Sequence, residues 1–308
     1  MRPAGFLDHR VSALPLYYFN RYSQRVETEQ IYGERWLRWI YGSPLGRVAL
    51  HALVKRSAFS RWYGWRMDSP ASRKRVAPFI RNYALDSSEF LEPVDSFQTF
   101  NEFFYRRLKP SARPIDPRPE AVVFPADGRH LGFADVSLIS GIFVKGETLS
   151  LTDLLQDTEL ATDYRRGTMI ISRLCPVDYH RYHFPVSGVP QAVRRIEGPL
   201  FSVNPIALRQ DIRILARNRR WITVIDSPTA GRVLMLEVGA TNVGSAVSTF
   251  NAGRAVVRGD EKGYFRFGGS LTLCLFLPGR VQLSEDLRVQ TGQGRELYAR
   301  MGDSCGLT

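Results

Sequence analysis

The sequence is poor in cysteine and has no long apolar run. Its 308 residues include three cysteines, Cys175, Cys274 and Cys305, too few and too scattered for a disulfide framework or a cysteine metal cluster. A reducing compartment is therefore the simpler setting, and we expect no metal site. No run reaches the roughly 18 apolar residues of a membrane-spanning helix, and the N-terminus lacks the apolar core and cleavage site of a signal peptide.

Acidic residues are scarce in the first quarter of the chain. The formal net charge is +12, and residues 1–81 contain 15 Lys or Arg against five Asp or Glu, an excess of 10 positive charges in this part alone. Such a patch requires an anionic partner, either nucleic acid or an acidic membrane surface. No helix-turn-helix, zinc-finger or single-strand-binding signature accompanies the charge, so we expect no nucleic-acid partner.

The same region contains four of the five tryptophans, Trp36, Trp39, Trp62 and Trp65, each close to arginine. Residues 33–41 and 48–56 are predicted to form short helices. Tryptophan and arginine on amphipathic helices are typical of a bilayer interface. A helical layer that packs on the rest of the protein and exposes a basic face to solvent explains the pattern equally well.

Two more helices are predicted downstream. Ser69-Pro70 is a good helix start, and apolar residues at helical spacing run to Tyr83, with Pro78 marking either a kink or the true start of the helix. Thr99-Phe100-Asn101-Glu102 is a capping box, and we expect its helix to end at Lys109-Pro110.

Beyond Pro114 the sequence indicates strands. Short apolar segments bounded by Gly, Pro and Asp recur at 122–124, 142–144, 168–171, 222–225, 233–236 and 271–277, which is typical of a mostly antiparallel β domain. One helix, capped by Ser150, interrupts them. The predicted fold class is α+β, with a helical, basic region at 1–110 and a β-rich domain at 111–308.

The stretch 265–277 raises the first question of chemistry. Gly268-Gly269-Ser270 reads as a turn between two strands, in which the serine bonds only its own backbone. Alternatively, the Gly269–Ser270 bond is itself reactive. Because Gly269 has no side chain and tolerates strained backbone angles, the Ser270 hydroxyl can reach its carbonyl group.

Three further residues supply candidate acid and base groups. Asp127 lies in an Asp-Gly pair after a strand, and His180 and His183 share an aromatic, arginine-containing segment. Each has a simpler structural explanation, as a turn residue or a buried histidine. Together, Asp127, His183 and Ser270 match the acid, base and nucleophile of a serine triad. The Gly-x-Ser-x-Gly elbow of a conventional hydrolase is missing.

A set of short motifs resembles the phosphatidylserine decarboxylase family from about residue 20 to about residue 285. Each motif is modest alone, but their order is highly specific: Phe100-Asn101-Glu102-Phe103-Phe104, Arg107-Leu108-Lys109-Pro110, Arg113-Pro114-Ile115, Pro125-Ala126-Asp127-Gly128, Val144-Lys145-Gly146, Asp178-Tyr179-His180-Arg181-Tyr182-His183, Leu200-Phe201-Ser202-Val203-Asn204, Val238-Gly239-Ala240-Thr241-Asn242-Val243-Gly244-Ser245 and Phe267-Gly268-Gly269-Ser270.

The resemblance implies a self-processing, pyruvoyl-dependent enzyme. Asp127 would orient His183, His183 would take the proton of Ser270, and Ser270 would attack the carbonyl of Gly269. Cleavage would leave chains 1–269 and 270–308, held together as a heterodimer, with a pyruvoyl cofactor made from Ser270. That group would form a Schiff base with the amine of phosphatidylserine and act as an electron sink, while His180 would assist decarboxylation to phosphatidylethanolamine.

The resemblance also gives the basic region a purpose. It implies docking on an anionic phospholipid membrane, as a peripheral protein of the cytoplasmic face of the cell membrane, and leaves a homo-oligomer open. Leu271 departs from the commonest bacterial motif, which has a hydroxyl residue there, so the processing rate and the identity of the serine lipid stay open. The alternatives are a serine hydrolase that uses Asp127, His183 and Ser270 without self-cleavage, and an inactive relative that binds acidic lipid.

Overall fold

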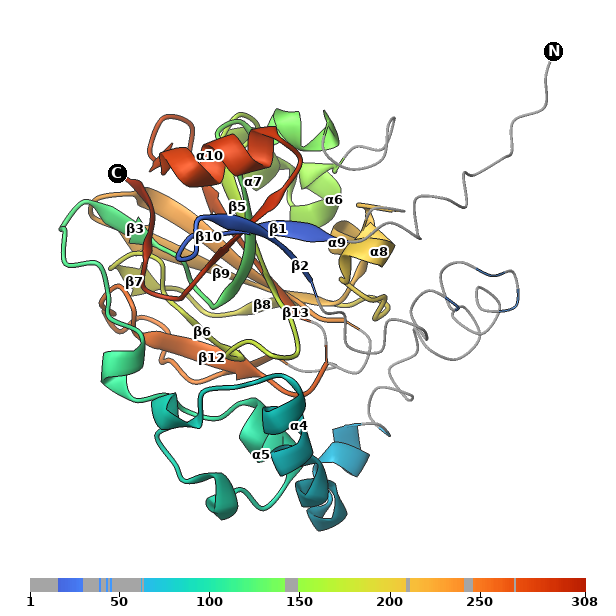
Figure 1. Cartoon of the computed structure of the whole chain (residues 1–308). Helices are drawn as coiled ribbons and strands as arrows, with labels where there is room; N and C mark the ends of the chain where they lie inside the picture. Colours follow the sequence, from blue (N-terminus) through green and yellow to red (C-terminus); the bar gives the residue numbers. More distant parts are fainter. Residues whose placement is uncertain are drawn as a thin grey trace.

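The computed structural model describes residues 16–29, 39, 43, 45, 62, 64–141, 149–208, 211–240, 246–268 and 270–308. The helices predicted at 33–41 and 48–56 and the strand predicted at 142–144 lie outside these residues, apart from Trp39. The described part is α+β with mostly antiparallel sheets (Figure 1), which confirms this part of the predicted fold class. Within the region predicted to be helical, Tyr17–Asn20 and Arg25–Thr28 are instead strands, because they pair with each other and with the central sheet. Within it, no helix combines the length and apolar character needed to cross a membrane.

A ten-stranded sheet forms the centre of the described structure, in the order β2-β1-β15-β4-β5-β13-β10-β9-β7, with β8 also paired to β9. Every neighbouring pair is antiparallel except β1 and β15. The strands are β1 Tyr17–Asn20, β2 Arg25–Thr28, β4 Gly128–Phe133, β5 Thr168–Leu174, β7 Val189–Pro190, β8 Arg194–Ile196, β9 Arg220–Ser227, β10 Gly231–Val238, β13 Ser270–Phe276 and β15 Glu296–Ala299.

Two three-stranded antiparallel sheets accompany it. The first has the order β11-β12-β6, and the second β14-β16-β3. Their strands are β3 Ala121–Val123, β6 Arg181–His183, β11 Ala246–Ser248, β12 Glu261–Phe265, β14 Gln282–Leu283 and β16 Ser304–Leu307.

Strand β13 is buried along its whole length because both faces of the central sheet are covered. Leu271, Leu273 and Leu275 point into one apolar cluster, whereas Cys274 and Phe276 belong to a second cluster on the other face. Since side chains alternate along a strand, Ser270 shares the face of Cys274 and Phe276.

Most helices of this part pack on the first cluster. The helix Glu285–Gly292 instead packs on β4 and β15 through Leu287, which belongs to the second cluster (Figure 1). Ser150 caps α6, as predicted, by accepting a hydrogen bond from the backbone of Asp153. The helices in this part are α6 Leu151–Leu155, α7 Thr158–Asp163, α8 Pro205–Leu208, α9 Ile214–Arg217, α10 Glu285–Gly292 and the 3₁₀ helix η7 Val136–Gly141.

A separate helical layer lies below the sheet β11-β12-β6 in Figure 1 and has its own aromatic core. It contains η3 Pro70–Arg75, α4 Val76–Asn82, η4 Ser87–Glu89, η5 Val94–Ser96, α5 Phe100–Phe104 and η6 Pro110–Ala112. The α-helical part starts at Val76, two residues before Pro78, which confirms that the regular helix begins near the proline. Thr99 caps α5 through the backbone of Glu102, as predicted.

The predicted end of the capped helix at Lys109-Pro110 is wrong, because α5 stops at Phe104. After Tyr105 the chain pairs with the preceding segment instead. Leu91 N donates to Arg107 O, and Lys109 N donates to Glu89 O. These tertiary hydrogen bonds replace those that a longer helix would have made.

Candidate active site

Ser270 is the first residue of β13 and is fully buried. It lies opposite Leu174 of β5, near the middle of the central sheet. Among the residues that the structure describes, its Oγ has no hydrogen-bond partner. Buried polar groups are nearly always hydrogen-bonded, so this hydroxyl differs from the turn serine bonded to its own backbone that the sequence also allows.

The chain that leads to Ser270 is fixed to the helical layer. Phe267 N donates to the buried Asn101 Oδ1 at 2.8 Å, and the Phe267 ring contacts the rings of Phe100 and Phe104. Gly268 has φ of 146°, a conformation that favours glycine. Gly269 lies outside the described residues, so the geometry of the Gly269–Ser270 bond stays a prediction.

Asp127 and His183 come from adjacent segments. The backbone N of His183 donates to Pro125 O at 2.7 Å, which brings β6 beside the segment before β4. The Asp-Gly pair there is more than a turn, because a Cβ on Gly128 would lie 2.4 Å from the backbone O of Arg173.

The carboxylate of Asp127 forms its hydrogen bonds with groups other than His183. It accepts hydrogen bonds from Arg113 at 2.6 to 2.9 Å and from Met301 N at 2.8 Å. Among the described residues no hydrogen bond joins Asp127 to His183, or Ser270 to either histidine. The three groups lie on neighbouring segments, and their roles as acid, base and nucleophile stay predictions.

His183 is buried, and its Nδ1 has no hydrogen-bond partner in the described part of the chain. Burial lowers the pKa of His183 to about 4, and the negative charges of Glu261 and Asp127 oppose that shift. The imidazole is therefore neutral at pH 7 and able to accept a proton. Glu261 acts on it more strongly than Asp127, since Glu261 is the cross-strand partner of His183 between β12 and β6.

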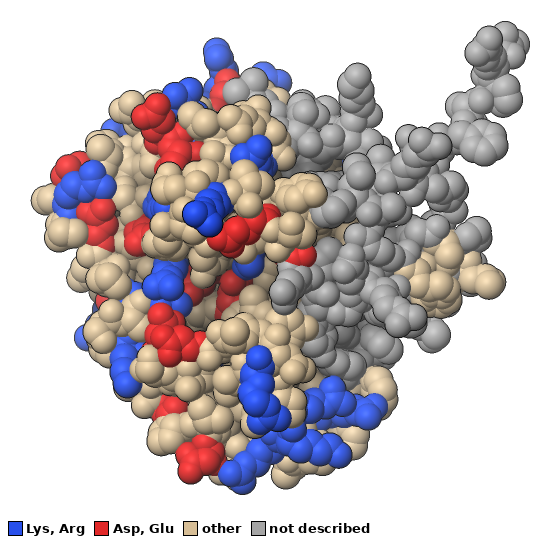
Figure 2. Space-filling view, in the orientation of Figure 1, with Lys and Arg blue, Asp and Glu red and all other residues tan. Residues whose placement is uncertain are grey.

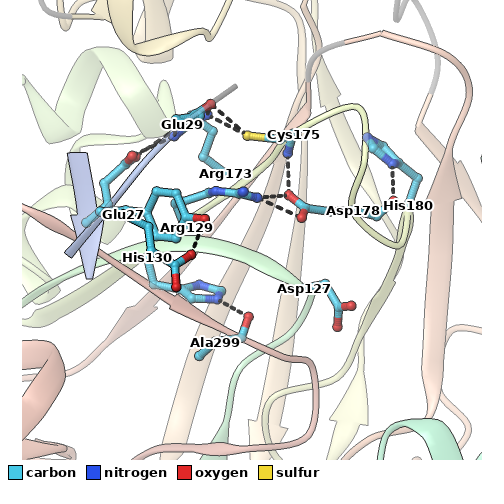
Figure 3. Close-up of polar contacts among 12 residues, drawn as sticks. Glu27, Glu29, Asp127, Arg129, His130, Arg173, Cys175, Asp178, His180 and Ala299 are labelled. Atoms are coloured by element: carbon cyan, nitrogen blue, oxygen red, sulfur yellow. Dashed lines mark hydrogen bonds and ion pairs between the residues drawn. The ribbon is translucent and has the colours of Figure 1, made fainter. Parts of the chain in front are cut away.

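His180 is fully buried and lies three residues earlier on the same segment. Its Nδ1 bonds to the backbone O of Asp178 at 2.9 Å (Figure 3). Its Nε2 has no hydrogen-bond partner within the described ranges. Its ring stacks on Phe104 with centroids 3.8 Å apart. Since Phe104 also contacts Phe267, His180 lies near the segment that precedes Ser270. Burial lowers the pKa of His180 to about 3.

A buried ion pair fixes the loop that contains His180. Arg129 Nη1 bonds both oxygens of Asp178 at 2.6 and 2.7 Å, as Figure 3 shows. Asp178 Oδ2 also accepts a hydrogen bond from the backbone N of Cys175 at 2.6 Å. The three cysteines are free and buried, and burial raises the pKa of Cys175 well above its ordinary value.

Sequence reasoning missed several residues around these groups. Asn101 and Arg113 lie within the motifs of the family. Their spacing does not show that Asn101 accepts a hydrogen bond from Phe267 or that Arg113 forms an ion pair with Asp127. Glu261 gave no signal, because its proximity to His183 depends on the pairing of β12 with β6. The ion pair between Arg129 and Asp178 gave no signal either, because the two residues lie far apart in the sequence.

Comparison with known proteins identifies the family. The family model described as phosphatidylserine decarboxylase matches residues 100–306. The chain is 42% identical over 290 residues to "Phosphatidylserine decarboxylase proenzyme" of Desulfitobacterium hafniense (strain Y51), covering 94% of this chain and 97% of the relative. A protein of the same name from Clostridium kluyveri is 41% identical, covering 94% and 98%, and one from Chlamydia pneumoniae is 40% identical, covering 94% and 96%.

These matches define a family of carboxy-lyases, and the three relatives just described carry the name proenzyme. The chain belongs to it, as a member of the phosphatidylserine decarboxylase family. The resemblance stated from the motifs is thereby confirmed. Neither a serine hydrolase without self-cleavage nor an inactive lipid-binding relative is favoured by these matches.

Proposed function

We propose that this protein decarboxylates phosphatidylserine to phosphatidylethanolamine, after cutting its own chain between Gly269 and Ser270. The observation that supports this most directly is the unpartnered, fully buried Oγ of Ser270 at the start of a central strand. The word proenzyme in the names of relatives about 40% identical supports a processed chain.

Self-processing needs only groups of this chain and one water molecule. Neutral His183 takes the proton of Ser270 Oγ, the oxygen attacks the Gly269 carbonyl carbon, and the peptide C–N bond breaks to leave an ester and a free amine. Loss of the Ser270 α-proton then breaks the Cβ–Oγ bond and releases chain 1–269 with a Gly269 carboxylate. Tautomerisation and addition of water expel ammonia and leave a pyruvoyl group on chain 270–308.

The residues around Ser270 fit a pyruvoyl group. That group, once bound to the substrate's amine, supplies an electron sink for the electrons left by carbon dioxide. The ring of His180, fixed through Nδ1 by the Asp178 carbonyl, presents Nε2 as the atom that moves a proton to or from the substrate. The aromatic layer around Phe104 excludes water from that side of the ring.

A test follows from the carboxyl group that is lost. The purified protein is mixed with vesicles containing phosphatidylserine labelled at the serine carboxyl, and released label is counted. Release by the wild type and none by Ser270→Ala is expected. Equal release by both would show that Ser270 is not the source of the active group.

The domain division and the membrane surface belong to the same proposal. We divide the chain near residue 110 into a membrane-docking region, 1–110, and a catalytic domain, 111–308. The aromatic core of the helical layer supports this division, whereas β1 and β2 are strands of the central sheet and so lie with the catalytic domain. Arg73, Lys74 and Arg75 end η3 and are exposed, and Trp65 is 70% exposed. Figure 2 shows Lys and Arg gathered at this end of the molecule. The protein is peripheral, on the cytoplasmic face of the cell membrane.

Liposome sedimentation tests the docking surface. We expect Lys74→Gln with Arg75→Gln to weaken binding to anionic vesicles by roughly tenfold to thirtyfold, since each basic residue near such a surface contributes about 1 kcal/mol. Arg165→Gln with Arg166→Gln is the matched control, because both are exposed but follow α7 at the opposite end of the molecule. Equal loss in the two double variants would remove the assignment of this face.

A further inference from the structure

Arg106 is a buried guanidinium without an acidic partner. It follows α5 by two residues and is 5% exposed. Its Nη1 lies 3.5 Å from the backbone O of Phe103, at the limit of a hydrogen bond. Its Nε has no partner among the described residues. In the part of the chain that the structure describes, Arg106 forms no ion pair. Buried charges in proteins are usually paired, so this exception indicates a missing anion.

The surroundings offset only part of the desolvation of this charge. The guanidinium lies over the rings of Phe90 and Phe103, at 4.8 and 5.0 Å from their centroids, which stabilises a cation modestly. The two carboxylates whose charges act on it are Asp127 and Asp178.

Both carboxylates are committed to other arginines. Asp127 is bonded by Arg113, and Asp178 is bonded by Arg129. These pairs also explain why burial prevails at Arg106 and lowers its pKa to about 10. The guanidinium is still charged at pH 7, so the neighbourhood retains a positive charge available to an anionic ligand.

This charge lies beside the candidate active site. Arg106 is two residues from Phe104, whose ring stacks on His180. Arg106 is also the charged residue whose field acts on the His180 imidazole. A ligand that contacts His180 therefore comes within reach of the Arg106 side chain.

We propose that Arg106 binds the phosphodiester group of the substrate, an inference that rests on the function proposed above. A guanidinium matches phosphate oxygens with two parallel hydrogen bonds. The serine headgroup has a second anion, its carboxylate, but that charge disperses as carbon dioxide leaves. Binding it tightly would stabilise the ground state more than the transition state. The phosphodiester keeps its charge throughout, so a cation bound to it orients the substrate without opposing the reaction.

A pair of lipids with the same acyl chains tests this in detergent micelles. One is phosphatidylserine, and the other is an analogue in which the serine oxygen is joined directly to the glycerol by an ether bond, without phosphate. We expect wild-type kcat/KM to favour phosphatidylserine by about 10- to 100-fold, the range for a hydrogen bond to a charged group. Arg106→Met should bring the ratio close to one while the chain is still cut in two.

Arg107→Met is the matched control. Arg107 is the next residue, its side chain is 58% exposed, and it pairs with Glu92, so the wild-type ratio should persist. Arg106→Lys, which keeps the charge but loses the forked geometry, should give an intermediate ratio and decides the matter if the methionine variant does not fold. An unchanged ratio in the lysine or methionine variant overturns the proposal. That result is expected if Arg106 binds the new carboxylate of chain 1–269 rather than the phosphodiester. A wild type inactive on phosphatidylserine would instead contradict the proposed function itself.

Discussion

The buried pair of Lys262 and Glu237 gives the sharpest prediction about stability. Both side chains are completely inaccessible to solvent, with Nζ 2.7 Å from Oε1. The ammonium lies 5.5 Å from the ring centroid of Tyr182 and 5.4 Å from that of Phe250. The second oxygen of Glu237 has no hydrogen-bond partner among the residues described. Burial raises the pKa of Glu237, and Lys262 opposes the rise.

Lys262→Met keeps an unbranched side chain one atom shorter but removes its charge, which leaves the Glu237 carboxylate unpaired. The Glu237 carboxylate is then protonated and becomes neutral. Because one pKa unit corresponds to about 1.36 kcal/mol and a free glutamate has a pKa of about 4.3, protonation at pH 7 costs about 3.7 kcal/mol. That figure lies within the roughly 3–5 kcal/mol found when one partner of a buried pair is removed.

The loss must depend on pH. In the variant the folded-state pKa of Glu237 is raised above its unfolded value, so the destabilisation is absent below about pH 4 and grows as pH rises. At pH 5 it should be only about 1 kcal/mol. Urea denaturation followed by tryptophan fluorescence measures both values, on preparations shown by mass to have the same chains. Glu237→Gln with Lys262→Met should remove the pH dependence. A deficit equal at pH 5 and pH 7 would refute this reasoning.

Four other predictions concern the site and its surroundings. Ser270→Ala and His183→Ala should each remain one uncut chain on a denaturing gel, and normal cutting of the histidine variant would remove His183 as the base. His180→Ala should be cut but release little carbon dioxide, so a variant with full turnover would exclude His180 from the reaction. Asn101→Ala should slow processing in a pulse-chase experiment, because Phe267 loses its hydrogen bond, and an unchanged rate would show that this contact does not position the bond. Acid should destabilise the fold below about pH 6.5, because burial lowers the pKa values of His130, His180 and His183 to about 3, 3 and 4. Between pH 6.5 and 5 these imidazoles stay neutral in the folded protein and are protonated from solvent when it unfolds, so urea midpoints that do not fall over this range would contradict the prediction.

The strands near Ser270 were predictable because their apolar residues are continuous. The predicted segment 271–277 differs by one residue from β13, which spans Ser270–Phe276, and burial on both faces explains the unbroken run. The end of α5 was not predictable from local pattern. Its last residues favour a helix, but hydrogen bonds to the segment before it, from Glu89 to Leu91, stop the helix at Phe104.

The site was predictable as a list of residues and not as a set of contacts. Motif order pointed to Ser270 and the two histidines, since each lies within a recognisable short segment. The partners come from tertiary pairing, which spacing does not encode. Arg113 forms an ion pair with Asp127 across a loop. Glu261 lies opposite His183 because β12 pairs with β6, in a register that shifts at Lys262. Local sequence gives no sign of either contact.

Intact mass measurement of the purified protein tests the central claim most directly. The account predicts two chains, 1–269 and 270–308, with the smaller one lighter by one ammonia than a peptide that begins with free serine and blocked to Edman sequencing. A single intact chain that nevertheless decarboxylates phosphatidylserine, or a small chain with a free serine at its start, would contradict it.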